Sequence, residues 1–399
     1  MNKIRRSALA IELIMTLITA IALGSCCNTQ KSENGSQMTA MTRGAADTIF
    51  NDKERLGKLL FFDTSLSTPP GQSCASCHDP GVAFADPVKE LPVSRGARPG
   101  VYGNRNDLAA SYAAFVPPLH RDPEENIWVG GLFWDGRVNT LAEQAMQPPL
   151  NPLEMANPDV CAIAEKLRAL EYAPLFKEVY GSDALADPDS AFAYMADAIE
   201  AYEKTSELNP FTSKYDHWLR GEADLSEQEK RGLELFEAEE KGNCAACHPS
   251  RPAENGTPPL FTDFTYDNLG VPKNPENPFY TLPPDLNPDG YDFVDLGLGA
   301  IVKDSLENGK FRVPTLRNAA VTDPYMHNGI FKNLFQMLAF YNNRDVAPWP
   351  GPEVPQNVNR DELGDLGLTN QELEDIVVFL RTLTDGWNPE NENNAQDSE

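Results

Sequence analysis

The chain has 399 residues, of which 41% are hydrophobic and 23% are charged. This composition excludes a fully disordered chain, a collagen and a polytopic membrane protein, and the length predicts two or three domains. Asp and Glu outnumber Lys and Arg by 60 to 33, so the net charge is −27. Such a charge repels phosphate backbones, which makes nucleic acid an unfavourable partner and a basic protein a favourable one.

The first 25 residues have the pattern of a secretory signal. Basic residues precede an apolar run over 8–23, and Leu-Gly-Ser then leads to Cys26. This junction resembles a bacterial lipobox, so we expect cleavage and lipidation at Cys26. An uncleaved membrane anchor is the alternative, but Glu12 lies inside the apolar run. We therefore expect a periplasmic protein that reaches the membrane only through its lipid, with a flexible tether over 26–45.

Four of the cysteines fall in two similar patterns. The patterns are Cys74-Ala75-Ser76-Cys77-His78 and Cys244-Ala245-Ala246-Cys247-His248. Cys-x-x-Cys-His is the attachment signal of a c-type haem, in which the two thiols bond the porphyrin and the histidine ligates the iron. Zinc is the alternative, but paired zinc motifs lie about 15–20 residues apart, whereas these motifs lie in different halves of the chain. The sequence therefore predicts two covalently bound c-type haems.

A similar segment precedes each motif. Leu-Gly-Lys-Leu-Leu-Phe occupies 56–61 and Arg-Gly-Leu-Glu-Leu-Phe occupies 231–236, and both suit amphipathic helices. Each half is also expected to end with a helix, at 190–204 and at 373–383. The repetition predicts a mostly α, loop-rich fold of two cytochrome c-like haem domains related by internal duplication.

Domain boundaries are predicted from this repeat. The first haem domain is expected over 46–210 and the second over 211–388, followed by a disordered acidic tail over 389–399. Capping boxes that begin at Ser226 and at Thr369 predict the starts of two helices in the second domain.

The first haem lacks an obvious second axial ligand. Neither His nor Met occurs between Asp79 and Leu119. An electron carrier needs such a ligand, whereas a peroxidase needs the position open. His120 is the nearest candidate, but a lone histidine is more often structural. We therefore expect an open haem in the first domain.

Further motifs carry a resemblance to a known family. They are Phe133-Trp134-Asp135-Gly136-Arg137, Gln144, Asn151-Pro152-Leu153-Glu154-Met155, Val313-Pro314-Thr315-Leu316-Arg317-Asn318 and Pro324-Tyr325-Met326-His327-Asn328-Gly329. In this order and spacing they resemble the bacterial di-haem cytochrome c peroxidase superfamily over 56–384. Within it the chain is most similar to the MauG branch, through 119–122 and 261–266. The resemblance implies an enzyme whose first haem reacts with peroxide and whose second haem stores an oxidising equivalent.

The resemblance also implies roles around the first haem. Glu154 and Gln144 match the distal pocket, where cleavage of the O–O bond needs a group that moves a proton between the two oxygens. Gln144 can hydrogen-bond peroxide without titrating, and a solvated loop carboxylate is the alternative for Glu154. Trp134 matches the aromatic residue between the two haems, although core packing would also explain it.

The second haem departs from the ordinary peroxidases of the family. Where those carry a methionine ligand, this chain has Tyr341, in agreement with the MauG branch. A phenolate is a hard ligand that favours Fe(III) and higher states, which suits a haem that stores an oxidising equivalent. Met337, one helical turn earlier, is the competing ligand.

Three further positions are notable. Asn106, with the main-chain oxygens of Thr322 and Pro324, matches a calcium site of the family, and oxygen ligands suit Ca²⁺. Gly242 stands where the MauG branch has a surface-relay tryptophan, so either the substrate differs or electrons enter by another face. Cys161 belongs to neither haem motif and is expected to be a buried, unreactive thiol.

These observations lead to one main hypothesis and two alternatives. The main hypothesis is a MauG-like oxidoreductase that uses hydrogen peroxide to oxidise a protein donor, which is a substrate protein, a cytochrome c or a cupredoxin. The first alternative is a cytochrome c peroxidase that detoxifies hydrogen peroxide with electrons from a monohaem cytochrome. The second is a non-catalytic di-haem electron carrier or sensor.

Overall fold

The computed structural model describes residues 50–389. The expected signal peptide, the lipidation site Cys26 and the tether over 26–45 lie outside this range, as do residues 390–399 of the predicted tail. Within the range, no helix has both the length and the apolar character needed to span a bilayer.

Helices dominate the regular structure of the described range. In chain order they are α1 (Asp52–Phe62), α2 (Leu141–Ala145), α3 (Gln147–Leu150), α4 (Val160–Ala169), α5 (Ala173–Tyr180), α6 (Pro188–Glu203), α7 (Lys214–Leu219), α8 (Glu227–Glu237), α9 (Leu298–Val302), α10 (Leu334–Asn343) and α11 (Asn370–Arg381). Short strands form two antiparallel pairs, β1 (His120–Arg121) with β2 (Trp128–Val129) and β3 (Tyr266–Asp267) with β4 (Phe311–Arg312). The predicted mostly α, loop-rich fold is confirmed.

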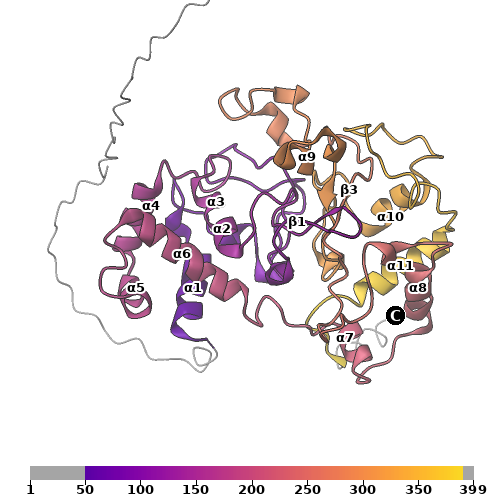
Figure 1. Ribbon diagram of the computed structural model, residues 1–399, viewed down its shortest axis with the longest axis horizontal. Helices are drawn as coiled ribbons and strands as arrows, with labels where there is room; N and C mark the ends of the chain where they lie inside the picture. Colours follow the sequence, from indigo (N-terminus) through magenta and orange to yellow (C-terminus); the bar gives the residue numbers. More distant parts are fainter. Residues whose placement is uncertain (1–49, 390–399) are drawn as a thin grey trace, which may run out of the picture. The chain divides into compact units, whose positions relative to one another are not determined.

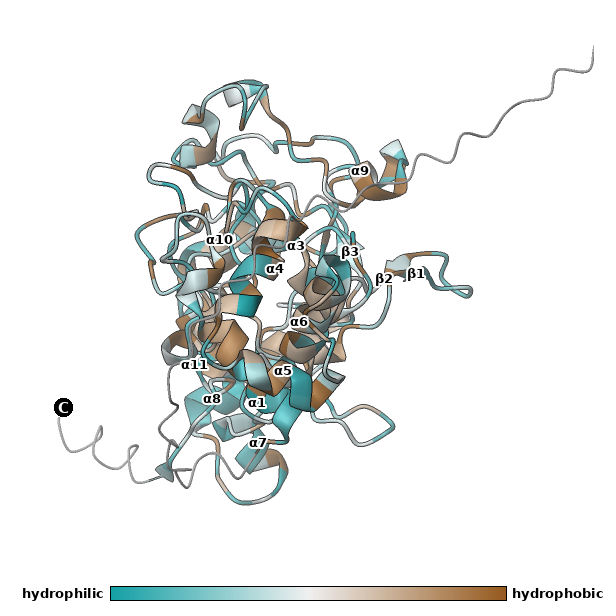
Figure 2. Cartoon of the chain, turned by 90° about the vertical axis from the view of Figure 1, so that its left-hand side faces the viewer, coloured by the Kyte–Doolittle hydropathy of each residue, from teal (hydrophilic) through white to brown (hydrophobic). Residues whose placement is uncertain are grey.

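In the first half, α1 packs along α6, and α2 and α4 also contact α6 (Figure 1). Leu60 and Phe61 of α1 are fully buried in this packing, as the amphipathic pattern predicts. Gly57 permits the close approach, because a Cβ there would lie 1.8 Å from the carbonyl oxygen of Ala198 on α6. Figure 2 shows hydrophobic and hydrophilic segments on these helices. The helix predicted over 190–204 is confirmed as α6.

The second half repeats this helix pair. Helix α8 packs against α11, which also contacts α10 (Figure 1). A Cβ on Gly232 would lie 2.0 Å from the carbonyl oxygen of Asp375 on α11, so the glycine in each repeated segment has the same packing reason. The capping boxes at Ser226 and Thr369 begin α8 and α11 as predicted.

Backbone hydrogen bonds beyond the helices also repeat. The N–H of Ala110 donates to the carbonyl of Phe84 at 2.9 Å, and that of Leu316 donates to Phe261 at 3.3 Å. Two residues later in each segment, the N–H of Tyr112 donates to the carbonyl of Leu208 at 3.2 Å, and that of Asn318 donates to the carbonyl of Leu383 at 3.0 Å. The paired bonds align the segment around Ala110 in the first half with the segment around Leu316 in the second half. An origin of the two halves by internal duplication stays a prediction.

Polar contacts join the two halves. Arg105 forms an ion pair with Asp295 at 2.6 Å, and Lys89 forms one with Asp323 at 2.6 Å. Arg105 also bonds Asp135 of its own half at 2.6 Å. The loops that follow the first haem motif are therefore held against the second half of the chain.

Candidate functional site

The first haem motif forms a tight 3-10 turn. The turn spans Cys74–Ser76, and the backbone N–H of His78 donates to the carbonyl of Cys74 at 2.9 Å. Burial raises the pKa of the Cys74 thiol to about 12, because a thiolate would be poorly solvated there. None of the four motif thiols forms a disulfide. Both sulfurs of the motif are thus available for thioether bonds.

The second motif repeats this turn beside a large cavity. Its turn spans Cys244–Ala246, and the N–H of His248 donates to the carbonyl of Cys244 at 2.9 Å. The cavity wall contains Cys247, His248 and Tyr341 among many apolar side chains. Two thiols and an imidazole in an apolar cavity fit a covalently bound porphyrin.

Both motif histidines keep one ring nitrogen for a metal. The Nδ1 atom of His248 lies 2.7 Å from the carbonyl oxygen of Phe261, and that of His78 lies 3.1 Å from the carbonyl oxygen of Phe84. Since a carbonyl only accepts, Nδ1 carries the proton in each ring, and the lone pair of Nε2 is left for iron.

A carboxylate distinguishes the first histidine from the second. Oδ2 of Asp107 lies 3.0 Å from Nδ1 of His78. Burial alone would lower the pKa of His78, but the charge of Asp107 outweighs it and raises that pKa to about 9. Burial instead lowers the pKa of His248 to about 4, opposed only by its bond to a backbone carbonyl. The motif sequences, which are nearly identical, did not predict this difference.

Several buried polar atoms around the first motif have no hydrogen-bond partner. They are Oε1 of Gln72, Oγ of Ser94, Oδ2 of Asp107 and Oε2 of Glu203. Burial raises the pKa of Glu203 to about 8, and its charge interacts with that of His78. Unsatisfied buried polar atoms are few in native proteins, so their concentration here fits a site built around a bound group, as a covalent haem requires.

Glu154 lies close to the first histidine. It follows α3, and its Oε1 accepts a hydrogen bond of 2.6 Å from Nδ2 of Asn151. Burial raises the pKa of Glu154, the charge of Arg137 and the bond from Asn151 oppose that rise, and smaller effects come from Asp107 and His78. The fold thus brings a carboxyl with a raised pKa into the neighbourhood of His78, where it can exchange a proton with a ligand.

Gln144 lies on α2, immediately before the segment that carries Glu154. Its side chain is partly exposed and bonds no other described residue. Helix α2 ends at Ala145 and α3 begins at Gln147. Gln144 therefore lies on α2 and Glu154 in the turn that follows α3, and the Gln144 amide is available to a ligand.

Trp134 belongs to the first half but borders the cavity of the second. Its Nε1 donates to the carbonyl oxygen of Asn106 at 2.8 Å. Its ring lies 6.5 Å from that of Phe311, which stacks on His327 with 3.7 Å between ring centroids. An aromatic path thus leads from Trp134 into the second half, and sequence reasoning missed its Phe311 and His327 members.

Helix α10 supplies the candidate axial ligands of the second haem. Tyr341 and Met337 both line the cavity. Burial raises the pKa of Tyr341, and the sulfurs of Cys244 and Cys247 raise it further, which places the phenol near the motif. The Tyr341 hydroxyl also lies 3.9 Å from Sδ of Met326, a second sulfur that the sequence analysis did not consider.

The three predicted calcium ligands all line the same cavity. Nδ2 of Asn106 donates to the carbonyl oxygen of Pro324 at 2.6 Å, and Thr322 lies two residues before Pro324. Amide and carbonyl oxygens are suitable donors for Ca²⁺. Binding would require the Asn106 amide to turn so that its oxygen, not its nitrogen, faces the ion.

Three other predicted residues have surroundings that bear on their expected roles. His120 is exposed on β1, and its Nδ1 lies 2.9 Å from the carbonyl oxygen of Pro118. Gly242 is buried, and a Cβ there would lie 2.4 Å from the carbonyl oxygen of Leu235, so no side chain fits at this position. Cys161 lies partly exposed on α4, so the expected full burial is wrong.

These features define a helical protein built to hold two c-type haems, with a carboxylate oxygen of Asp107 3.0 Å from Nδ1 of the first motif histidine. Family models give the same class. The model described as di-haem cytochrome c peroxidase matches residues 51–224, and the model described as cytochrome c matches residues 229–384.

Individual proteins extend this likeness over most of the chain. The chain is 41% identical over 349 residues to the methylamine utilization protein MauG of Paracoccus denitrificans (strain Pd 1222), which covers 83% of this chain and 88% of the relative. It is 33% identical to a cytochrome-c peroxidase of Denitromonas iodatirespirans, covering 84% and 81%. The crystal structure of the diheme peroxidase BthA from Burkholderia thailandensis E264 matches with a TM-score of 0.73 at 35% identity, covering 84% and 86%. The chain belongs to the di-haem cytochrome c peroxidase family.

Family membership confirms several predictions. The chain has two cytochrome c-like regions, holds two c-type haems and is a peroxidase-type oxidoreductase. The similarity to MauG predicted from the motifs is confirmed as well.

Proposed function

We propose that the chain is a MauG-like oxidoreductase that uses hydrogen peroxide at the first haem and oxidises a protein donor. His78 and His248 would ligate the two irons, and Tyr341 would be the second ligand of the second haem. The haems supply the iron that reacts with peroxide at one site and stores oxidising equivalents at the other. The observation that carries the proposal is the position of Glu154 near His78, with a pKa raised by burial.

Glu154 would serve as the acid–base group of the first site. Cleavage of the O–O bond of peroxide is easier when the leaving oxygen departs as water, which requires one proton to move between the two oxygens. A carboxyl whose pKa is raised is better suited to hold and return that proton than one at its ordinary value. Gln144, whose amide bonds no other described residue, would orient the peroxide by a hydrogen bond without taking the proton.

Two further residues would act at the second site, Trp134 in electron transfer between the haems and Tyr341 as an iron ligand that sets the preferred oxidation state. The bond from Nε1 of Trp134 to Asn106 fixes the indole at the border of the second cavity, where it can pass electrons between the haems. Tyr341 would supply a hard anionic oxygen that stabilises Fe(III) and higher states. Met337 and Met326 are the competing ligands, and a sulfur ligand would instead favour Fe(II).

The electron donor is proposed to be a protein, either a substrate side chain or a small redox protein such as a cytochrome c or cupredoxin. The net charge of −27 favours a basic docking face on that partner. Electrons would enter by a route other than position 242, because Gly242 is buried against the carbonyl oxygen of Leu235. The first alternative, a detoxifying cytochrome c peroxidase, is supported by relatives that bear that name.

Export and calcium complete the proposal. The basic and apolar N-terminal segment supports export to the periplasm, with lipidation at Cys26.

The two haem domains would meet near residues 210 and 211. Asn106, Thr322 and Pro324 would bind one Ca²⁺ where the loops of the two domains touch, since all three line the same cavity and offer oxygen ligands.

The proposal is tested by adding hydrogen peroxide to the fully ferric protein while optical and EPR spectra are recorded. We expect a resting high-spin ferric signal from the first haem that disappears within seconds of mixing. A reaction that begins only after one haem is reduced would favour the detoxifying peroxidase. Two six-coordinate, low-spin haems at rest would favour the electron carrier and refute the proposal.

A further inference from the structure

The two haem-ligating histidines differ in what their Nδ1 atoms face. Nδ1 of His248 lies 2.7 Å from the carbonyl oxygen of Phe261. Nδ1 of His78 lies 3.1 Å from the corresponding carbonyl oxygen of Phe84 and, in addition, 3.0 Å from Oδ2 of Asp107. The first histidine therefore has two acceptors around a single N–H, and one of them is a carboxyl oxygen.

Oδ2 of Asp107 lacks a hydrogen-bond partner among the described residues. The atom is buried, and no residue donates a well-aligned hydrogen bond to it. Nδ1 of His78 lies 3.0 Å from this oxygen, but the ring N–H is directed at the carbonyl of Phe84. A buried carboxylate oxygen without a donor is costly, and a small rotation of the imidazole would let its N–H bond Asp107.

The second half has no carboxylate at the matched position. The bonds from Ala110 to Phe84 and from Leu316 to Phe261 align the two loops, and Asp107 then matches Val313. Val313 is buried and lines the cavity of the second haem. The chain thus places a carboxylate beside one histidine, whereas the matched position of the second half carries an aliphatic side chain.

This asymmetry has a defined chemical effect. A carboxylate that accepts the Nδ1 proton of a metal-bound histidine makes the imidazole a stronger electron donor to the metal. Stronger donation stabilises the higher oxidation states of iron and lowers the reduction potential of the haem. We propose that Asp107 is a positioning residue that makes His78 an electron-rich ligand and so adapts only the first haem to peroxide chemistry.

The proposal rests on the proposed role of His78 as an iron ligand, and its test uses properties of the bound haem rather than turnover. The Asp107→Asn variant keeps the shape of the side chain but removes its charge. We expect at least a tenfold shift of the redox equilibrium of the first haem toward Fe(II), which is 59 mV for one electron. Spectroelectrochemistry measures this shift, and resonance Raman of the ferrous protein should show a lower Fe–His stretching frequency.

Asp86→Asn is the matched control. Asp86 also lies close enough to interact electrostatically with Asp107 and Cys77, but its Oδ1 accepts from the backbone of Val88 and it does not contact His78. We expect a smaller potential shift and an unchanged Fe–His frequency. Equal effects of the two substitutions would show that any nearby carboxylate charge shifts the potential of the first haem, and would overturn the specific role of Asp107.

The wild-type protein provides a reading that does not depend on any variant folding. The Fe–His frequency of its ferrous first haem should fall in the range of imidazolate-like ligands, and a value typical of neutral imidazole would overturn the proposal. Repeating the measurement in excess Ca²⁺ and in EDTA shows whether a cation bound at the neighbouring Asn106 contributes to the Fe–His frequency. Haem content measured as pyridine haemochrome confirms attachment. Failure of the ferric protein to react with peroxide would refute the proposed function but leave these two readings interpretable.

Discussion

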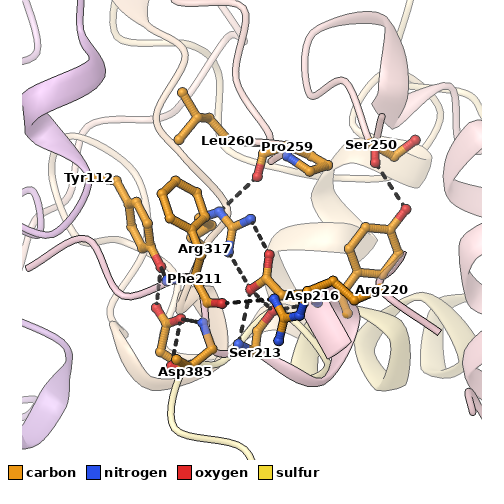
Figure 3. A network of polar contacts seen from close by, with 12 residues as sticks. Tyr112, Phe211, Ser213, Asp216, Arg220, Ser250, Pro259, Leu260, Arg317 and Asp385 are labelled. Carbon is orange, nitrogen blue, oxygen red and sulfur yellow. Dashed lines mark hydrogen bonds and ion pairs between the residues drawn. The ribbon is translucent and has the colours of Figure 1, made fainter. Parts of the chain in front are cut away.

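A buried ion pair between Arg317 and Asp216 is expected to be a main stabilising contact of the second half (Figure 3). Each side chain is only 1% exposed. The two guanidinium NH₂ groups of Arg317 donate to the two carboxylate oxygens of Asp216 at 2.9 and 2.8 Å, and Nε donates to the carbonyl oxygen of Pro259 at 2.7 Å. Arg317 thereby fixes a segment that lines the cavity of the second haem.

Asp216→Asn should destabilise the protein by about 3 kcal/mol. The substitution removes one of two charge-assisted hydrogen bonds, each worth about 1.5–3 kcal/mol, and turns an amide N–H₂ toward the guanidinium. It also leaves a buried cation without its anion, for which losses of about 3–5 kcal/mol are typical. We take the lower end because the amide oxygen still accepts one bond, and because Arg317 keeps its contacts with the rings of Phe211 and Tyr112.

The pH dependence of this loss follows from the pKa of Asp216. Burial alone would raise that pKa, but the hydrogen bonds and charge of Arg317 outweigh burial and hold it below its ordinary value. A carboxyl whose pKa is lower in the folded state stabilises the protein above the pKa of the unfolded chain, about 3.9. The difference between wild type and Asp216→Asn should therefore persist at neutral pH and shrink as the pH falls below about 4.

Urea unfolding of the holoprotein, followed by far-UV circular dichroism, measures the loss. Glu222→Gln is the control, because Glu222 is exposed in its ion pair with Arg220 and its replacement should leave the midpoint near that of wild type. The double variant Asp216→Leu with Arg317→Met should recover part of the lost stability, since it removes both charges. A loss below about 1 kcal/mol for Asp216→Asn, against the 3–5 kcal/mol typical of a broken buried pair, would refute the reasoning.

Three further predictions concern the site and its support. Glu154→Gln should slow the reaction of the first haem with peroxide by a factor of about 10²–10⁴, measured by stopped-flow absorbance, because the amide cannot carry the proton. Tyr341→Met should raise the potential of the second haem in a spectroelectrochemical titration, because a thioether favours Fe(II). Gly232→Ala should lower stability by about 1–3 kcal/mol in urea, since its Cβ would meet the carbonyl oxygen of Asp375 at 2.0 Å.

Each of these has a matched control. Glu143→Gln, an exposed change on α2, should leave the peroxide rate unchanged, and an equal loss in both variants would remove Glu154 from the reaction. Met337→Leu should keep the optical spectrum of the second haem, whereas a changed spectrum would make Met337 the ligand. Gly351→Ala should unfold like wild type because nothing lies within 4 Å of its added Cβ. Similar midpoints for both glycine variants would contradict the packing argument.

The sequence alone was sufficient for features encoded in short contiguous segments. Each Cys-x-x-Cys-His motif closes its own turn, so the haem attachment sites are readable without knowledge of the fold. Capping boxes at Ser226 and Thr369 act within one helical turn, and both helices begin where predicted. The spacing of the further motifs was sufficient to recognise the family.

The contacts that distinguish the two sites were decided by tertiary structure. Asp107 meets His78 because a long loop returns to the first motif, and no local pattern marks that return. The pairing of Arg317 with Asp216 likewise depends on a segment that folds back across the second half. The prediction that Cys161 is buried is also wrong, because this residue lies partly exposed on α4.

The physical reason for this division is the range of the interactions. Hydrogen bonds within a turn and the spacing of two thiols involve neighbours in the chain, so residue order determines them. The pKa values of Glu154 and His78 depend instead on desolvation and on charges brought from distant segments. Residue order therefore determined that this protein binds two haems, and the packing of its loops decided how differently those haems are surrounded.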